Sequence, residues 1–344
     1  MRITILTVGS RGDIQPYLAL ALRLKAVGYE VCIATEQIYQ AWITQEGIKY
    51  AFLPGNSKEL HANEAWFKLL EETDSRPILS AYRAYREFLL PTLRELLDAA
   101  WEACQGSDVI LSLPTVYAGS HIAEKLGIPC FTVWTCPFTP TRYFPHAWSR
   151  LPSQQWAGGA LNRFSYWIPQ LLDEKVLLPT INQWRQDTLG LPPVKTHSKQ
   201  VQAYPTLYNY SAAVLAKPAD WNDRIHLTGY WFLDRQEPFH PPDELVEFLA
   251  DGPAPVYIGF GSIGDRNATR TLQIAVDAVD KSGQRAVLES GWAVFKQIKL
   301  PPQIFQLQSG AVPHAWLFPR MAALIHHGGA GTTAQASAAV SLLS

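Results

Sequence analysis

The chain has 344 residues, of which 47% are hydrophobic and 17% are charged, and its formal net charge is −1. This length suits two domains better than one, and the composition argues against a disordered chain. The balanced charge also argues against a protein that binds a nucleic-acid backbone, since such proteins are normally basic.

Cysteine, histidine and hydropathy patterns point to no disulfide, metal or membrane-spanning segment. The four cysteines have no CxxC spacing and the histidines have no HxH or HxxxH spacing, so neither a disulfide framework nor a metal site is expected. The first residues resemble a strand, not a signal peptide, and no uncharged apolar run reaches about 18 residues. We therefore expect a cytoplasmic protein, and peripheral contact with a membrane stays open.

The first two thirds of the chain alternate short apolar strands with amphipathic helices. Strands are expected at 3–8, 31–34, 50–53, 109–113, 130–134, 206–209 and 225–228. Helices are expected from near Pro16 to Gly28 and at 57–72, 77–102, 116–126 and 161–189. Such alternation predicts an α/β fold, with a parallel sheet that carries helices on both faces.

The segment 135–160 interrupts this pattern. Its first part contains three prolines, which exclude a regular helix or a central strand. It is also rich in aromatic residues, which either build a core or line an apolar ligand site. A long loop of this kind in a compact domain is usually functional.

A polar, proline-rich stretch predicts a linker at 236–250, between a first domain at 1–235 and a second at 251–344. After it a second series begins, with strands at 255–260, 285–289 and 322–325 and a helix at 268–281. Both halves open with a strand, a glycine turn and a helix. This arrangement suggests two similar domains.

The strongest motif is His-Gly-Gly-Ala-Gly-Thr-Thr at 327–333, between a predicted strand and the last predicted helix. Glycines let a ligand approach the backbone, and the start of a helix presents free N–H groups to an anion. The motif therefore favours a diphosphate site, although a tight turn with glycines for geometry alone would look similar. A second glycine turn, Gly-Phe-Gly-Ser at 259–262, could hold the same diphosphate from another side.

The third motif is Gly-Ser-Arg-Gly-Asp at 9–13, after the first predicted strand. Asp13 would lie at the carboxyl end of that strand, where open α/β sheets bind their ligands. A carboxylate there could act as a general base, or it could simply cap the helix that is expected near Pro16. The turn is not GxGxxG, which argues against an NAD-linked enzyme.

These motifs together resemble the GT-B nucleotide-sugar glycosyltransferases of family one. The likeness is greatest to the branch of sterol 3-beta-glucosyltransferases and of bacterial enzymes that glycosylate lipids, macrolides and glycopeptide antibiotics. It spans nearly the whole chain and rests on the segments 9–16, 141–146, 259–262, 312–319 and 327–333.

The resemblance implies a GT-B fold, with two Rossmann-like domains of doubly wound parallel sheet that face a cleft. It implies an inverting transfer of a sugar, expected to be glucose, from a UDP-sugar to a hydroxyl of an apolar acceptor such as a sterol or lipid. Asp13 matches the catalytic base of the family. The donor diphosphate would be bound without a metal ion by Ser262, His327, Gly329, Gly331 and Thr332.

The resemblance also assigns the nucleoside and the acceptor. Val312 and His314 would bind the nucleoside. The residues expected to bind the acceptor are Phe138, Arg142, Tyr143, Phe144 and Trp148. For the aromatic members of that set, a role in closing the domain core is an equal alternative.

The sequence departs from the family pattern at its end. In the family, the helix after the glycine motif leads to an Asp-Gln pair that binds the donor sugar, and this sequence reaches Ser344 without it. The resemblance therefore implies an incomplete second domain, from a shortened or frameshifted chain or in a subunit completed by another polypeptide. The alternative function is that of a catalytically dead relative, which binds a lipid or protein partner without sugar transfer.

Overall fold

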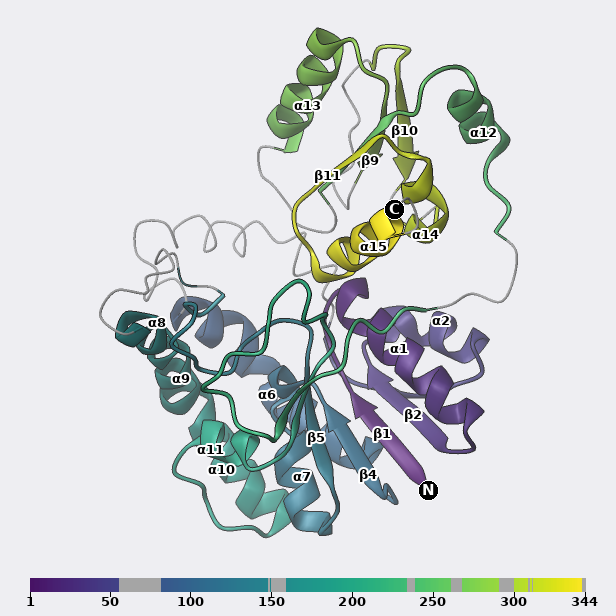
Figure 1. Ribbon diagram of the computed structural model, residues 1–344. Coiled ribbons are helices and arrows are strands. Elements are labelled where there is room, and N and C mark those ends of the chain that lie inside the picture. The colour runs from purple at the N-terminus through teal and green to yellow at the C-terminus, as the bar shows by residue number, and fades with distance from the viewer. Residues whose placement is uncertain are drawn as a thin grey trace. The chain divides into compact units, whose positions relative to one another are not determined.

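The computed structural model describes residues 1–55, 82–147, 149, 159–233, 239–260, 268–290, 300–308, 310 and 312–341. The chain divides into two compact units, with the change between them after Leu233. Each unit is built on its own parallel sheet, and helices pack against its strands (Figure 1). The predicted α/β class is confirmed.

The first sheet has seven parallel strands in the order β3-β2-β1-β4-β5-β6-β7. They are β1 (Arg2–Leu6), β2 (Glu30–Thr35), β3 (Lys49–Phe52), β4 (Val109–Ser112), β5 (Cys130–Trp134), β6 (Thr206–Tyr208) and β7 (Ile225–Leu227). The central strand β1 pairs with β2 on one side and with β4 on the other, so that Leu6 lies beside Ala34 and Ser112. The order reverses between β1 and β4.

Most helices of the first unit lie at predicted positions, with local breaks, whereas the short helices at 40–45 and 197–202 were not predicted. The described helices are α1 (Arg11–Ala26), α2 (Gln40–Gln45), α6 (Leu90–Ala103), α7 (Gly119–Leu126), α8 (Ala160–Ser165), α9 (Trp167–Leu172), α10 (Leu178–Trp184) and α11 (His197–Gln202). Short 3-10 turns occupy Gln37–Tyr39 and Pro114–Val116, and π turns occupy Tyr85–Leu89, Asp173–Leu177 and Arg185–Leu189. The predicted helix at 57–72 lies outside the described residues.

Two of the π turns are each followed, after one intervening residue, by a proline. Pro91 and Pro179 each occupy the second position of the α-helix that follows. A proline has no N–H to donate, so one regular helical hydrogen bond is lost at that point, and an i→i+5 turn is a common local adjustment. The predicted helix at 161–189 is therefore a series of short helical pieces.

The core of the first unit follows from strands that are apolar on both faces. Ile5, Ile33, Ile110 and Val133, each from a different strand, are fully buried in one hydrophobic cluster. A parallel sheet is covered on both faces, which is why its strands read as continuous apolar runs.

The second unit contains a four-stranded parallel sheet in the order β10-β9-β8-β11. Its elements are α12 (Asp243–Ala250), β8 (Val256–Gly259), α13 (Ala268–Ser282), β9 (Ala286–Ser290), β10 (Ile304–Gln308), α14 (His314–Leu317), a 3-10 turn (Phe318–Arg320), β11 (Ala323–His326) and α15 (Ala330–Ser341). Strand β10 was not predicted, because the polar residues in Ile-Phe-Gln-Leu-Gln mask its apolar face. Here too the order reverses, between β8 and β11.

Alternate residues of these strands enter two separate cores. Tyr257 and Val287 pack in one cluster with Leu317, whereas the next residues along each strand, Ile258 and Leu288, pack in another. This is the two-residue period of a strand.

Helix α12 belongs to the second unit. Leu245 is fully buried in the cluster that contains Tyr257 and Val287. The linker predicted at 236–250 is therefore wrong for residues 243–250, whose high charge hid an apolar helix face.

Both sheets place a glycine motif at a reversal of strand order. In open α/β sheets, ligands bind beyond the carboxyl ends of the strands at such a reversal. In the first unit the turns after β1 and β4 occupy that position, and in the second unit the turns after β8 and β11 do so. These four turns define where to look for a site.

Candidate functional site

The turn between β1 and α1 is shaped around the carboxylate of Asp13. Gly9 has a φ of +130°, and a Cβ on it would lie 2.6 Å from Asp13 Oδ2. The backbone N–H of Ser10 donates to the same oxygen at 2.9 Å, and its hydroxyl donates at 3.0 Å. The acid is thus held against the start of the helix, and only glycine fits at position 9.

Helix α1 begins earlier than the sequence suggested. Its N-cap is Ser10 and Asp13 is its third residue, and the two form a capping box. The prediction of a helix that starts near Pro16 is wrong, because Pro16 lies inside the helix. Asp13 is therefore not the N-cap itself, although its carboxylate does accept from the capping residue.

The segment after β2 fastens this turn from a second side. Glu36 is only 3% exposed, and its Oε1 accepts from the N–H of Gly9 at 3.1 Å. The hydroxyl of Tyr39 donates to the carbonyl of Gly9 at 3.1 Å. Dinucleotide-binding folds use an acidic residue at the end of the second strand to bind the ribose. Glu36 has that position here, but its carboxylate is engaged in holding the Asp13 turn.

The segment after β5 shares the electrostatic surroundings of Asp13. Burial raises the pKa of the Cys136 thiol, and the negative charge of Asp13 adds to that rise. Burial also raises the pKa of Tyr17 well above its ordinary range, again with a contribution from Asp13. The start of the aromatic loop therefore lies within electrostatic reach of the predicted base.

The aromatic loop is anchored by its backbone. The N–H groups of Phe138 and Thr139 donate to the hydroxyl of Tyr208 at 3.1 and 2.8 Å. The N–H of Arg142 donates to Asp220 at 2.9 Å. These bonds fix a proline-rich segment that has no sheet partner of its own.

The predicted acceptor residues divide between the two alternatives. Phe138 packs on Trp134 with ring centroids 4.6 Å apart, and Phe144 meets the edge of Trp221 at 6.2 Å. Tyr143 is 49% exposed, and the Arg142 side chain is exposed too. Trp148 lies outside the described residues. Phe138 and Phe144 thus contribute to internal packing, whereas Tyr143 and Arg142 face solvent.

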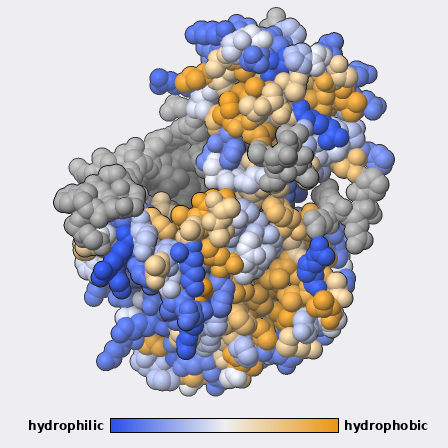
Figure 2. Space-filling view, in the orientation of Figure 1, coloured by the Kyte–Doolittle hydropathy of each residue, from blue (hydrophilic) through white to orange (hydrophobic). Residues whose placement is uncertain are grey.

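Hydrophobic residues also reach the surface in patches between hydrophilic ones (Figure 2). Beyond the loop itself, Phe164 and Trp167 are 56% and 52% exposed. Their rings stack at 5.6 Å. An exposed aromatic pair on short helices of the first unit is the kind of surface that binds apolar molecules.

In the second unit, β11 leads through His327, Gly328 and Gly329 into α15. Gly328 has a φ of +84°, and a Cβ on Gly329 would lie 2.5 Å from His327 Nε2. The imidazole thus lies directly against Gly329. Gly331 and Thr332 stand in the first turn of α15, where N–H groups have no acceptor within the helix.

His327 brings the two glycine motifs of this unit together. Burial lowers its pKa, and the backbone of Gly259 at the end of β8 offsets part of that shift. Its Nδ1 is buried without a hydrogen-bond partner in the part of the chain that the structure describes. Ser262 lies outside that part. The motifs meet here because His326 pairs with Gly259 across the sheet.

Val312 and His314 have different surroundings. Val312 is 3% exposed and packs in a core cluster, so it could contact a nucleoside only through its backbone. His314 stacks on Phe318 with centroids 4.4 Å apart. Its Nε2 donates to Glu289 Oε2 at 3.0 Å.

Sequence reasoning missed Glu289, which organises this corner of the second unit. Besides His314, the N–H of Gly310 at 3.1 Å and the hydroxyl of Tyr257 donate to its carboxylate. Burial would raise the pKa of Glu289, but the hydrogen bonds from His314, Tyr257 and Gly310 hold it below its ordinary value. The signal in the sequence was a charged residue near the carboxyl end of a buried apolar strand.

Among the described residues, no three histidine, cysteine or acidic side chains gather as metal ligands would. In the same residues, no helix is long and apolar enough to cross a membrane.

Comparison with known proteins finds a family match within the first unit. Residues 3–145 match the model of the glycosyltransferase family 28 N-terminal domain. The motifs described above resemble family one of the GT-B enzymes, whereas the model that matches is that of family 28.

The chain is also similar to fungal sterol 3-beta-glucosyltransferases. It is 40% identical to the enzyme of Neurospora crassa and 40% identical to that of Penicillium rubens, over 97% of this chain in each case. It is 38% identical to the enzyme of Pichia angusta over 96% of this chain. It spans 22%, 24% and 27% of these relatives, so the likeness covers about a quarter of each. The predicted kinship with this branch is confirmed.

Solved structures show the fold. The glycotransferase of kitacinnamycin superposes with a TM-score of 0.68 at 18% identity, over 97% of this chain and 77% of that one. The calicheamicin glycosyltransferase CalG4 gives 0.64 at 16% identity, over 98% and 77%. VinC in complex with dTDP gives 0.58 at 18% identity, over 97% and 78%. The two units thus have the predicted GT-B fold.

Proposed function

We propose that the protein is an inverting glycosyltransferase that transfers glucose from UDP-glucose to the hydroxyl of a sterol or a similar apolar lipid. The observation that carries this proposal is the 40% identity to sterol 3-beta-glucosyltransferases across 97% of the chain. VinC in complex with dTDP, a protein of the same fold, supports a nucleoside diphosphate at the second unit.

Asp13 would act as the general base. It would take the proton of the acceptor hydroxyl while that oxygen bonds to the anomeric carbon of the sugar. The bond from that carbon to the diphosphate oxygen breaks, and UDP leaves from the opposite face, which turns an α-linked donor into a β-glycoside. The two hydrogen bonds from Ser10 suit this role, because they hold the carboxylate in one orientation.

The second unit would stabilise the negative charge that grows on the leaving diphosphate. The first N–H groups of α15 and the side chain of Thr332 are donors at the positive end of the helix dipole. The negative charge of the diphosphate would favour protonation of His327, which would add a donor at the Nδ1 that has no partner among the described residues. Donors that are in place before the reaction stabilise the transition state without reorganisation.

The acceptor would be bound by the first unit, near the aromatic loop. The exposed ring of Tyr143 offers an apolar surface. Cys136, at the start of the loop, shares the electrostatic surroundings of Asp13. A flat, apolar acceptor with a single hydroxyl fits such a combination of aromatic surface and nearby carboxylate.

The test measures transfer from UDP-glucose to ergosterol and, separately, calorimetric binding of UDP. We expect Asp13→Asn to lower transfer by about a thousandfold, in the range for loss of a general base, while UDP binds as before. Asp223→Asn, in an exposed position of the same unit, is the matched control and should keep full activity. A chain that binds the sterol and gives no response to UDP or UDP-glucose would replace this function with that of a lipid-binding relative.

A further inference from the structure

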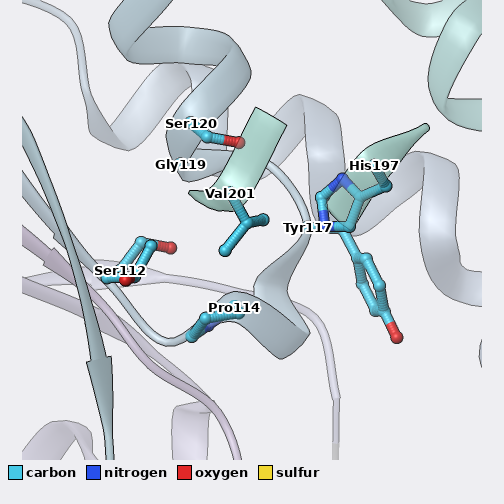
Figure 3. Close-up of a pocket in the computed structure, with 8 residues that line it drawn as sticks. Ser112, Pro114, Tyr117, Gly119, Ser120, His197 and Val201 are labelled. Atoms are coloured by element: carbon cyan, nitrogen blue, oxygen red, sulfur yellow. The ribbon is translucent and has the colours of Figure 1, made fainter. Parts of the chain in front are cut away.

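A small pocket lies beside the carboxyl end of β4, at the N-terminus of α7 (Figure 3). Its walls include Ser112 from β4, Gly119 and Ser120 from α7, and His197 and Val201 from α11. The empty space, its open mouth included, is about 190 Å³, but the centre of a water-sized sphere can reach only about 10 Å³ of it. That is room for one such sphere, so the inner end of the pocket can hold a single atom or one end of a larger ligand.

A chain of three hydrogen-bonded side chains ends at this pocket. Arg185 Nη1 lies 2.7 Å from His121 Nδ1, and His121 Nε2 lies 3.2 Å from His197 Nδ1. All three side chains are buried, with Arg185 1%, His121 0% and His197 4% exposed. His197 Nε2 has no hydrogen-bond partner among the described residues.

Arg185 fixes the direction of both hydrogen bonds that link these three side chains. A guanidinium can only donate, so Nδ1 of His121 must accept and Nε2 of His121 must carry the proton. That proton is donated to Nδ1 of His197, which leaves the proton of His197 on Nε2. Burial lowers the pKa of His121 well below its ordinary value and lowers that of His197 to about 4, so both rings are neutral at pH 7.

The unpartnered atom is therefore a hydrogen-bond donor. Figure 3 shows the imidazole of His197 at the edge of the pocket, with one ring nitrogen turned toward the other lining residues. A buried donor without an acceptor destabilises the folded protein, and an acceptor bound at this point would remove that cost.

The start of α7 adds donors of the same kind. Its N-cap is Ala118, whose side chain offers no acceptor to the first N–H groups of the helix. Ser112 packs so closely on the first residue of α7 that a Cβ on Gly119 would lie 2.4 Å from its hydroxyl oxygen. No carboxylate lines the pocket among the described residues, and the charge of Arg185 is already paired with Glu124 at 2.9 Å.

We propose that this pocket binds one small anion, a halide or one oxygen of a carboxylate, between His197 Nε2–H and the N-terminus of α7. His197 Nε2–H and the first N–H groups of α7 are donors, and the helix dipole favours negative charge there. Because Arg185 fixes the tautomers of both histidines, Nε2 of His197 remains a donor. An isolated neutral histidine could present either a donor or an acceptor at this point. The site is independent of the proposed sugar transfer, since none of its residues belongs to the predicted machinery.

Crystals of the full chain soaked in sodium bromide test the proposal directly. We expect an anomalous peak within hydrogen-bond distance of His197 Nε2, and we expect formate to displace it. A well-ordered water at that position in the presence of bromide, or an empty pocket, would overturn the proposal. This experiment uses the wild-type protein, so its outcome does not depend on whether a variant folds.

Substitutions then test the contribution of His197 to anion binding. His197→Leu should weaken the bromide-dependent rise in Tm to an extent that corresponds to about tenfold lower affinity, as expected for loss of one hydrogen bond to a charged ligand. His197→Gln places an amide N–H near the same point and should retain most of the effect. His226→Leu, an exposed histidine on β7, is the matched control and should respond as the wild type does. Equal responses from His197→Leu and the wild type would remove His197 from the site.

Discussion

The two units place a glycine turn at the same topological position and use it in opposite ways. In the first unit, the turn after β1 is hydrogen-bonded to side chains of its own and of the segment after β2. Gly9 is bonded to Glu36 and Tyr39, and Asp13 is bonded to Ser10. In the second unit, the turn after β11 ends in a helix whose first N–H groups need an external acceptor. One turn holds an acid still, and the other offers donors.

The difference follows from a few residues, since both turns join a strand at the reversal of strand order to a helix. A Ser and an Asp three residues apart form a capping box at the start of α1. In α15 the corresponding region contains Gly329, Gly331 and Thr332, which cannot close such a box. A capped helix start positions a carboxylate as a base, and an uncapped one binds an anion. The same fold therefore supports two roles in one proposed reaction.

After the substitution of Asp13 itself, the largest expected effect comes from disturbing the turn after β1 at Gly9. Gly9→Ala should lower transfer by about a hundredfold, the scale associated with a 1 Å displacement of a catalytic group. The reason is that a Cβ would meet Asp13 Oδ2 at 2.6 Å. Steady-state kinetics with UDP-glucose and ergosterol would measure this loss.

Gly127→Ala is the matched control for that variant. Gly127 also has a positive φ, +66°, but a Cβ there would meet nothing within 4 Å. It should cost about 1 kcal/mol of stability and leave the rate unchanged. Equal activity in the two variants would show that the turn does not position Asp13.

The sequence predicted the alternation, the parallel sheets and the places of both turns, because apolar strand runs and glycine after a strand are local signals. It did not predict that Asp13 and Ser10 form a capping box, since Pro16 looked like the start of the helix. It also missed α12, where Leu245 is the only fully buried side chain in an acidic stretch. Features that depend on a partner far along the chain, such as Glu36 with Gly9 or Glu289 with His314, have no local signal.

The next largest effect should come from Glu289, the counterpart of Glu36 in the second unit. Glu289→Ala leaves the donors on Tyr257 and His314 without their acceptor. It should cost about 3 kcal/mol of unfolding free energy, as for buried donors that lose their acceptor. Urea denaturation would measure the loss, and UDP affinity should fall with it because Gly310 and His314 flank Val312.

The pH dependence of stability provides an independent check on Glu289. Its folded pKa lies below the ordinary value, since hydrogen bonds from His314, Tyr257 and Gly310 outweigh burial. Such a carboxylate stabilises the fold above its unfolded pKa, and the contribution is lost as the pH falls through the folded pKa. The stability difference between the wild type and Glu289→Gln should therefore be constant above about pH 5 and narrow below about pH 4. A difference that does not change with pH would mean that the carboxylate is not ionised.

A smaller effect is expected at the turn after β11. His327→Ala should weaken UDP binding by about tenfold, the worth of one hydrogen bond to a charged group, with little change in stability because the ring is only partly buried. Calorimetry with UDP would measure it. His240→Ala, a solvent-exposed position of the same unit, should bind UDP as the wild type does, and an unchanged dissociation constant in His327→Ala would remove the diphosphate from this turn.

The smallest effect separates the two explanations of the glycine motif. A Cβ on Gly331 would meet nothing within 4 Å, and the residue lies in the first turn of α15. If glycine served only the geometry of the turn, Gly331→Ala would be harmless or would stabilise the helix by up to about 1 kcal/mol. If a diphosphate approaches the backbone there, the same methyl group should weaken UDP binding severalfold while Tm stays equal or rises. Gly329→Ala should differ, because its Cβ would meet His327 Nε2 at 2.5 Å and displace the ring. A gain in stability with a loss of affinity at Gly331 is the combination that a purely structural glycine cannot produce.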